Sequence, residues 1–153
     1  MESVEDRTPA RITYLVKQVE RGVRLVLEQA VREFGLSTVQ YATLSVLARR
    51  SGLSSAQLAR RAFVTPQAMN QVVGQLEDAQ LISREPDPAN WRILRASLTE
   101  EGERRLASCE AAVDLVEARV LASLEPDSVE LLRSALESCA VELREMIESA
   151  DAD

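Results

Sequence analysis

The sequence predicts a mainly α-helical protein with one small β-hairpin, and three observations support that fold class. Aromatic residues make up only 3% of the 153-residue chain, while Ala, Leu and Val are plentiful. This balance favours helix packing over a sheet sandwich. Apolar residues recur at helical spacing over most of the chain. The spacing of apolar residues becomes that of β-strands only within residues 81–98, in two short segments.

The first predicted helix runs from Pro9 to about Phe34. Thr8 is a good N-cap and Pro9 a good first helical residue, while Gly35 ends the segment. An apolar stripe at helical spacing follows its length: Ile12, Leu15, Val16, Val19, Val23, Val26, Ala30 and Val31. The stripe predicts one face that packs against other helices.

Three shorter helices come next, and each has its own N-terminal signal. Ser37-Thr38-Val39-Gln40 has the pattern of a capping box and opens a helix to about Arg50. Ser54-Ser55-Ala56-Gln57 repeats that pattern for a third helix, and Thr65-Pro66 begins a fourth. The buried side of the fourth helix is expected to consist of Met69, Val72, Val73 and Leu76.

The segments Leu81–Glu85 and Arg92–Leu98 are strand candidates, and the turn-rich loop Pro86–Trp91 lies between them. Three short helices followed by a hairpin is the order of a winged helix-turn-helix. In that arrangement the later helix enters the major groove of DNA, and the hairpin, or wing, reaches the backbone or minor groove.

Two more helices follow the wing. Thr99 caps a fifth helix to about Leu124, and Asp127-Ser128-Val129-Glu130 is the capping box expected for a sixth. One apolar stripe consists of Leu106, Cys109, Val113, Val116 and Val120, and the other of Leu132, Leu136, Cys139, Leu143 and Met146. With the first helix, these stripes exceed what a small winged domain can cover, so a homodimer is expected.

The chain is therefore expected to be one integrated domain with three parts. Residues 1–36 form an N-terminal dimerisation helix, residues 37–98 the winged DNA-binding lobe, and residues 99–153 a C-terminal helical hairpin for dimerisation.

Charge is distributed unevenly over these parts. The formal net charge is −7, yet residues 37–98 hold seven arginines and four acidic residues, a net charge of +3. Residues 99–153 hold five arginines and 15 acidic residues, a net charge of −10. The middle segment is suited to double-stranded DNA, and the acidic helices are expected to face away from it.

The fourth predicted helix lacks charge on its polar side, because no Lys or Arg occurs from Ala62 to Ser83. Asn and Gln side chains can bind adenine through two hydrogen bonds. The candidates for base contact are Thr65, Gln67, Ala68, Asn70, Gln71 and Gln75. The candidates for backbone and wing contacts are Arg49, Arg50, Arg60, Arg61, Arg84, Asn90, Trp91, Arg92 and Arg95. A Gln-rich face is also common on helices that merely face solvent. Here the face lies between arginine-rich segments and a wing, and this position favours base contact over simple solvation.

Three stretches of the chain resemble the multiple-antibiotic-resistance regulator (MarR) family: Leu58–Met69, Leu76–Arg84 and Leu98-Thr99-Glu100-Glu101-Gly102. The likeness covers residues 8–149 and is strongest over residues 54–102. The resemblance implies a homodimeric, bacterial transcriptional repressor or regulator that binds near-palindromic DNA and is often released by small phenolic or anionic ligands.

Two positions depart from the pattern of that family. The family's wing usually carries Asp-x-Arg at its tip, whereas this chain has Asn90-Trp91-Arg92, so Asn90 offers Arg92 no carboxylate. The turn after the DNA-reading helix usually holds Gly, whereas this chain has Gln80, which predicts mild strain or a different turn.

A ligand site is expected on the first helix, where Arg11, Tyr14, Gln18 and Arg21 share one face. Tyr41 on the second helix would complete a cleft between the dimer helices and the DNA lobe. A solvated face with one half-exposed Tyr explains the same residues, and only the family resemblance favours a pocket.

Cys109 and Cys139 each lie on an apolar stripe and are expected to be small buried residues. The alternative is a redox switch, because antiparallel helices would place them within about one turn of each other.

Catalysis, cofactors and metals are not expected. The chain has no His, no glycine-rich phosphate loop, no nucleophile elbow and no cluster with metal-ligand spacing. The absence of a signal-like segment and of an 18-residue apolar run predicts a cytoplasmic protein without a membrane partner. The competing function is a winged-helix module that binds protein and not specific DNA. The arginines of residues 37–98 argue against it.

Overall fold

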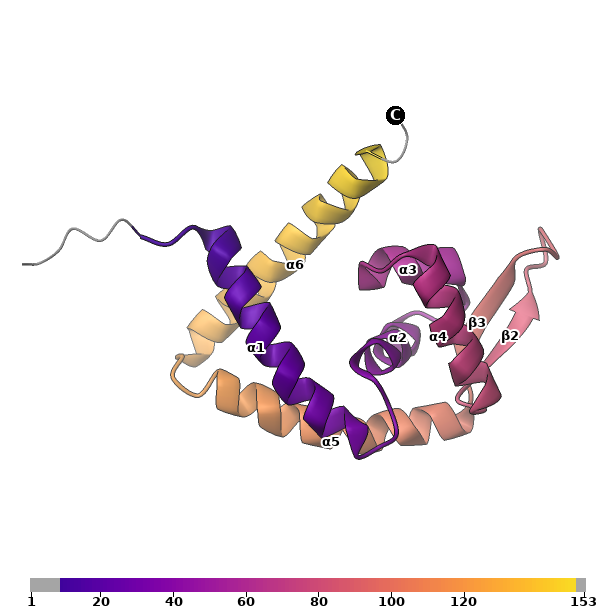
Figure 1. The fold of residues 1–153 in the computed structure, drawn as a ribbon, viewed down its shortest axis with the longest axis horizontal. Coiled ribbons are helices and arrows are strands. Elements are labelled where there is room, and N and C mark those ends of the chain that lie inside the picture. Colours follow the sequence, from indigo (N-terminus) through magenta and orange to yellow (C-terminus); the bar gives the residue numbers. More distant parts are fainter. Residues whose placement is uncertain (1–8, 151–153) are drawn as a thin grey trace, which may run out of the picture.

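The computed structural model describes residues 9–150 (Figure 1). The helices are α1 (Ile12–Arg32), α2 (Thr38–Arg49), α3 (Ser55–Ala62), α4 (Pro66–Asp78), α5 (Glu100–Val120) and α6 (Pro126–Ala150). The strands are β1 (Leu53–Ser54), β2 (Ile82–Pro86) and β3 (Leu94–Leu98). This order confirms the predicted fold class, a mainly helical chain with a β-hairpin wing. Helices α2, α3 and α4 gather beside the hairpin, and α5 runs from below them to the other side of the molecule, where α1 and α6 lie.

Four predicted N-caps are present: Ser37, Ser54, Thr65 and Thr99. Ser37 and Ser54 complete capping boxes with Gln40 and Gln57, so each pair satisfies two backbone N–H groups. Pro66 takes the first helical position of α4, where its missing N–H costs nothing.

Helices α1 and α6 begin at other residues than the sequence predicted. Helix α1 starts at Ile12, with Arg11 as an N-cap that makes no side-chain cap hydrogen bond, so Pro9 is not helical. The apolar stripe also starts at Ile12, so the helix begins where its apolar pattern begins. Arg11 has no side-chain oxygen that could accept a backbone N–H of the first turn. The predicted cap Thr8 lies outside the described residues. Helix α6 begins at Pro126, so the predicted box at Asp127 falls inside the helix.

The sheet has three strands in the order β1-β3-β2, and β1 was not predicted. Leu53 and Ser54 pair antiparallel with Ala96 and Arg95 of β3. Two residues are too few to show a strand period, which explains why the sequence pattern missed β1. The extra strand ties the wing to the start of α3.

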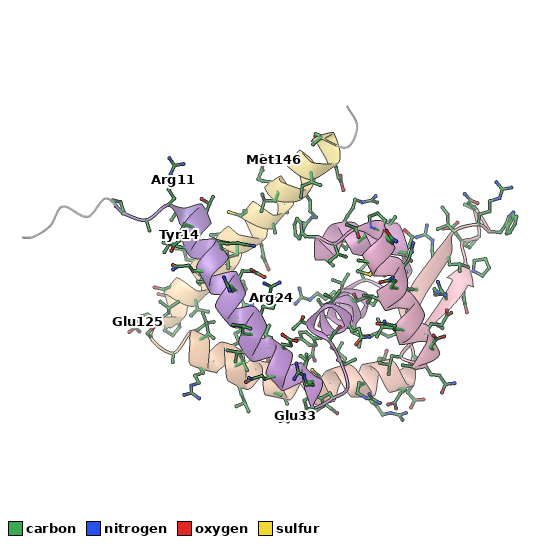
Figure 2. The ribbon with its side chains drawn as sticks, in the orientation of Figure 1. Arg11, Tyr14, Arg24, Glu33, Glu125 and Met146 are labelled. Carbon is green, nitrogen blue, oxygen red and sulfur yellow. The ribbon has the colours of Figure 1, made fainter. Side chains whose placement is uncertain are left out.

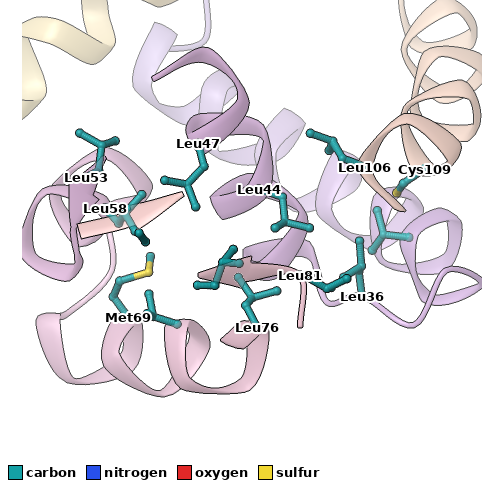
Figure 3. Packing of buried hydrophobic residues seen from close by; sticks show 14 of the residues in the cluster. Leu36, Leu44, Leu47, Leu53, Leu58, Met69, Leu76, Leu81, Leu106 and Cys109 are labelled. Carbon is teal, nitrogen blue, oxygen red and sulfur yellow. The ribbon is translucent and has the colours of Figure 1, made fainter. Parts of the chain in front are cut away.

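The buried core lies between α2, α3, α4, the sheet and the first half of α5 (Figure 3). Met69, Val73 and Leu76 of α4 are buried in it as predicted, while Val72 is only half-buried. Val31 of α1 and Cys109 of α5 both belong to this core. Burial of these side chains fixes the face that α4 turns outward.

The remaining apolar residues of α1 and α6 are not covered within one chain. Val31 is the buried residue of α1, and α6 has none. Large side chains there are strongly exposed, including Ile12 (74%), Leu131 (72%) and Met146 (66%). Figure 1 shows α5 and α6 diverging after their turn, so the C-terminal hairpin is open.

The two cysteines have different environments. Cys109 is buried as expected, but Cys139 is exposed, and both are free. Cys139 is exposed in one chain because α6 packs little against the rest of that chain, so its expected burial requires the second copy that the apolar stripes predict. Burial raises the pKa of the Cys109 thiol, which disfavours the reactive thiolate.

Candidate nucleic-acid interface

Helix α4 turns an uncharged amide face away from the core. Gln67, Asn70 and Gln71 are exposed on the side opposite Met69 and Val73. The position of this face follows from the helical period, because the apolar residues must turn inward. The face presents side-chain donors and acceptors that are not used inside the described part of the chain.

The other candidates for base contact have partial roles in the fold. The Thr65 hydroxyl accepts the backbone N–H of Ala68 at 3.1 Å and thereby caps α4. The Gln75 side-chain oxygen accepts a hydrogen bond from the Gln40 side-chain amide at 3.0 Å, which links α4 to α2. Ala68 is half-buried. The three freely exposed amides are therefore the strongest candidates.

The arginines near α4 divide into two groups. Arg49, Arg50 and Arg61 are exposed at the ends of α2 and α3. By contrast, Arg84 of β2 forms an ion pair with Glu77 of α4, and this hydrogen bond lowers the pKa of the Glu77 carboxyl. Arg84 thus holds the wing against α4.

Arg95 is also engaged within the fold. Its guanidinium pairs with the buried Asp87 carboxylate and donates to the Gly52 carbonyl at 2.9 Å. The Asp87 carboxylate accepts the backbone N–H groups of Ala89 (2.7 Å) and Asn90 (3.1 Å). The Ala89 N–H and then Arg95 hold the pKa of Asp87 below its ordinary value. This network joins the loop and the wing to Gly52, the residue before β1.

The wing tip presents Trp91 and Arg92 to solvent. The Arg92 guanidinium lies over the Trp91 ring, 5.5 Å from its centroid, and Trp91 is 73% exposed. The Asn90 side-chain oxygen accepts the backbone N–H of Arg92 at 3.2 Å. Asn90 therefore shapes the turn, and a cation–π contact takes the place of a carboxylate partner for Arg92.

Gln80 adopts the left-handed conformation, with φ +59°, so the strained turn is the correct one of the two predicted alternatives. The Gln80 N–H donates to Glu77 and the Leu81 N–H donates to Leu76, a Schellman ending of α4. The Thr99 hydroxyl also donates to the Gln80 carbonyl at 2.7 Å. The turn is thus the ordinary Schellman turn, and Gln80 is strained because its Cβ disfavours the left-handed conformation.

The ligand cleft expected between α1 and α2 is not formed within one chain. Tyr14, Gln18 and Arg21 line a shallow cavity of about 520 Å³ on α1, and Arg11 and Tyr41 do not line it. Figure 2 shows Arg11 and Tyr14 at the outer end of α1. Helix α1 joins the core near Val31, so its N-terminal half extends away from α2, the helix that carries Tyr41.

Tyr41 instead packs half-buried against the core. Burial raises the pKa of its phenol, so this hydroxyl remains protonated at neutral pH.

The sequence pattern missed several residues that position this interface: Gln40, Glu77, Asp87 and Glu148. Gln40 was predicted only as part of a capping box, and Asp87 carried a local signal, because Asp before Pro at the start of a turn commonly accepts nearby backbone N–H groups. Glu148 forms an ion pair with Arg60 at 3.3 Å across 88 positions of the sequence, which no local pattern reveals.

Residues 9–150 contain no group of three or more His, Cys, Asp or Glu side chains arranged to hold a metal ion. Over the same residues, no helix is both long enough and apolar enough to cross a membrane.

A helix-turn-helix lobe with an exposed reading helix and a stacked arginine on its wing defines a winged helix-turn-helix DNA-binding protein. The model of the MarR family matches residues 34–93. The HTH-type transcriptional repressor Rv2887 of Mycobacterium tuberculosis is 41% identical over 115 residues, which cover 75% of this chain and 83% of that protein. The chain belongs to the MarR family of transcriptional regulators.

Solved structures agree with this assignment. A MarR-family regulator from Rhodococcus sp. RHA1 superposes with a TM-score of 0.78 at 26% identity, covering 84% of this chain and 91% of that one. Rv2887 in complex with p-aminosalicylic acid gives a TM-score of 0.71 at 37% identity, covering 85% and 98%. Rv2887 in complex with DNA gives 0.69 at 36% identity, covering 86% and 98%.

Proposed function

We propose that this protein is a homodimeric repressor that binds a near-palindromic operator and is released by a small aromatic or anionic ligand. The exposed, uncharged face of α4 is the observation that carries the proposal. It lies between arginines at the ends of α2 and α3 and the wing that ends in Arg92. The function requires binding and release only, and no catalytic step.

The interface divides the work of recognition. Gln67, Asn70 and Gln71 would read base edges in the major groove, with adenine as the preferred partner. Arg49, Arg50 and Arg61 would neutralise phosphates, and Arg92 would enter the minor groove. Arg84 and Arg95 would act indirectly, by holding the wing in place.

The uncovered apolar faces of α1 and α6 support a homodimer. Exposed side chains such as Ile12, Leu131 and Met146 would be buried by a second copy. A two-fold dimer presents two α4 helices, which suits a palindromic site. The acidic C-terminal part would then be the dimer base, away from the phosphates.

The relatives support the remaining parts of the proposal. Rv2887 is named a repressor and has been solved with DNA and with p-aminosalicylic acid. By analogy, we propose an aromatic carboxylate as the effector class for this chain.

Selection of bound sequences from a random duplex pool tests the DNA proposal, followed by gel shifts at low and moderate salt. The expected result is a palindromic consensus with A·T pairs at the contacted positions, bound by one dimer. A protein-interaction module would enrich no consensus and lose its weak binding at moderate salt. That outcome would overturn the proposal.

A further inference from the structure

The wing tip carries two large side chains on one tight turn, and Trp91 and Arg92 are its central residues. The Ile93 N–H donates to the Asn90 carbonyl at 2.9 Å and closes the turn. The Asn90 side-chain oxygen also accepts the Arg92 N–H. Below the turn, the Asp87 N–H donates to the Ile93 carbonyl at 2.8 Å. The backbone under both side chains is therefore held by its own hydrogen bonds.

The indole of Trp91 lies in solvent at the end of the wing. It belongs to the single tryptophan of the chain and is 73% exposed. Ile93 and Leu94 beside it are 39% and 41% exposed, so three large apolar side chains are grouped at this tip. Figure 1 shows the hairpin on the side of the molecule opposite α1. A second copy packed on α1 would leave the tip free, and grouped apolar side chains of this kind mark a contact surface.

The charge of the tip matches DNA. Residues 88–93 contain one arginine and no acidic residue. The Asp87 carboxylate just before them is buried and paired with Arg95, and Glu85 lies farther along β2. The guanidinium of Arg92 thus gives the tip a positive charge. An apolar ring beside one cation is complementary to a sugar–phosphate surface, where apolar deoxyribose alternates with anionic phosphate.

The stacking of the two side chains limits how the ring can meet DNA. The guanidinium carbon of Arg92 lies over one face of the Trp91 ring, 5.5 Å from its centroid. Insertion between two base pairs requires both faces of a ring, so only contact through the free face remains. The minor groove of B-DNA is about 6 Å wide. A pair whose centres are already 5.5 Å apart does not lie across this groove unless the groove widens.

We propose that Trp91 is a specificity-determining residue that packs its free face on the deoxyribose wall of the minor groove, with Arg92 stacked on the other face. The stacked pair requires a widened groove, so the wing prefers flexible pyrimidine–purine steps such as TA over stiff, narrow A-tracts. An arginine without the ring has the opposite preference, because a narrow groove has the stronger negative potential. This role rests on the function proposed above and adds a shape-reading position to the bases read by α4.

The test uses the full-length protein and the operator found by selection. Three operator duplexes carry a TA step, an A-tract or G·C pairs under the wing, with the bases under α4 unchanged. The wild type is expected to bind the TA duplex about fivefold or more tightly than the A-tract duplex. Trp91→Ala is expected to reverse this order. Trp91→Phe is expected to keep it, because the ring that carries Arg92 remains.

The control variant is Ile93→Ala, which removes an exposed apolar side chain beside the ring and is expected to retain the preference for the TA step. Thermal melts verify that each variant is folded. The emission of the single tryptophan is recorded during the titration. It is expected to move to shorter wavelength on the TA duplex, because the indole leaves water. An unchanged spectrum at saturating DNA would place the ring in solvent, free for a protein partner, and would overturn the proposal.

Short duplexes that carry the same three steps but no operator are titrated in parallel. A selected operator with the same step preference in wild type and Trp91→Ala would overturn the role of Trp91 alone. A preference for TA steps that Trp91→Ala reverses, without any consensus under α4, would contradict the proposed function and leave the role of Trp91 standing.

Discussion

At the scale of single residues, backbone strain is located at Gln80. Gln80 holds a left-handed conformation at the end of α4, with φ +59°. Gln80→Gly is expected to raise the free energy of unfolding by about 1 kcal/mol, because glycine adopts this conformation without a Cβ clash. Denaturant titration measures the change. Ala79→Gly, at φ −78°, is the neighbouring control and is expected to give no gain.

The Asp87 carboxylate predicts a pH dependence of stability. Its pKa is depressed in the folded state, so its contribution is full above the ordinary carboxyl pKa of about 4. The contribution is lost as the pH falls through the lower, folded value. Asp87→Asn should therefore lower the melting temperature at neutral pH.

The difference from the wild type should shrink as the pH falls below about 4. Circular dichroism melts across pH measure it. Asp114→Asn, on the exposed face of α5, is the control. A melting difference for Asp87→Asn that is constant with pH would contradict the role assigned to this carboxylate.

The wing-tip arginine is expected to act on DNA without contributing to the fold. Arg92→Ala should weaken operator binding substantially and leave the melting temperature unchanged, because the side chain is exposed. Arg61→Ala should instead lower affinity for all sequences and reduce the salt slope by about 1. A salt titration of binding measures both. Equal affinities of Arg92→Ala and wild type at every salt concentration would refute the wing assignment.

At the scale of one element, α4 combines a buried apolar side with an exposed amide side. Gln71→Ala should relax sequence preference by roughly 1–3 kcal/mol at one base position and change non-specific affinity less. Binding to a set of single-base operator variants measures this. Gln75→Ala is the matched control, since that amide is already bonded to Gln40. Retained specificity after removal of Gln67, Asn70 and Gln71 together would show that α4 is not the reader.

For the whole molecule, the exposed faces of α1 and α6 predict an obligate dimer. Sedimentation at micromolar concentration should show one dimeric species, and dilution should cause dissociation together with unfolding. Leu131→Glu places charge on an apolar residue that is 72% exposed in one chain. It should disrupt assembly, whereas Glu130→Gln beside it should not. A folded monomer of the wild type would contradict the prediction.

Features decided by neighbouring residues were predictable from the sequence. The capping boxes at Ser37 and Ser54 and the cap at Thr65 each depend on bonds that span three residues. The outward amide face of α4 follows from the helical period, whereas at Gln80 the sequence left a strained or a different turn open, and the structure has the strained one. The family resemblance rested on the same local patterns.

The tertiary structure alone decided which side chains from distant segments meet. It paired Arg95 with Asp87 and Gly52, and Arg60 with Glu148. It separated Tyr41 from the cavity on α1 and left Cys139 exposed. Local signals work because a helix period or cap is set by residues within one turn, whereas these contacts depend on the packing of entire helices. The same packing leaves α1 and α6 uncovered.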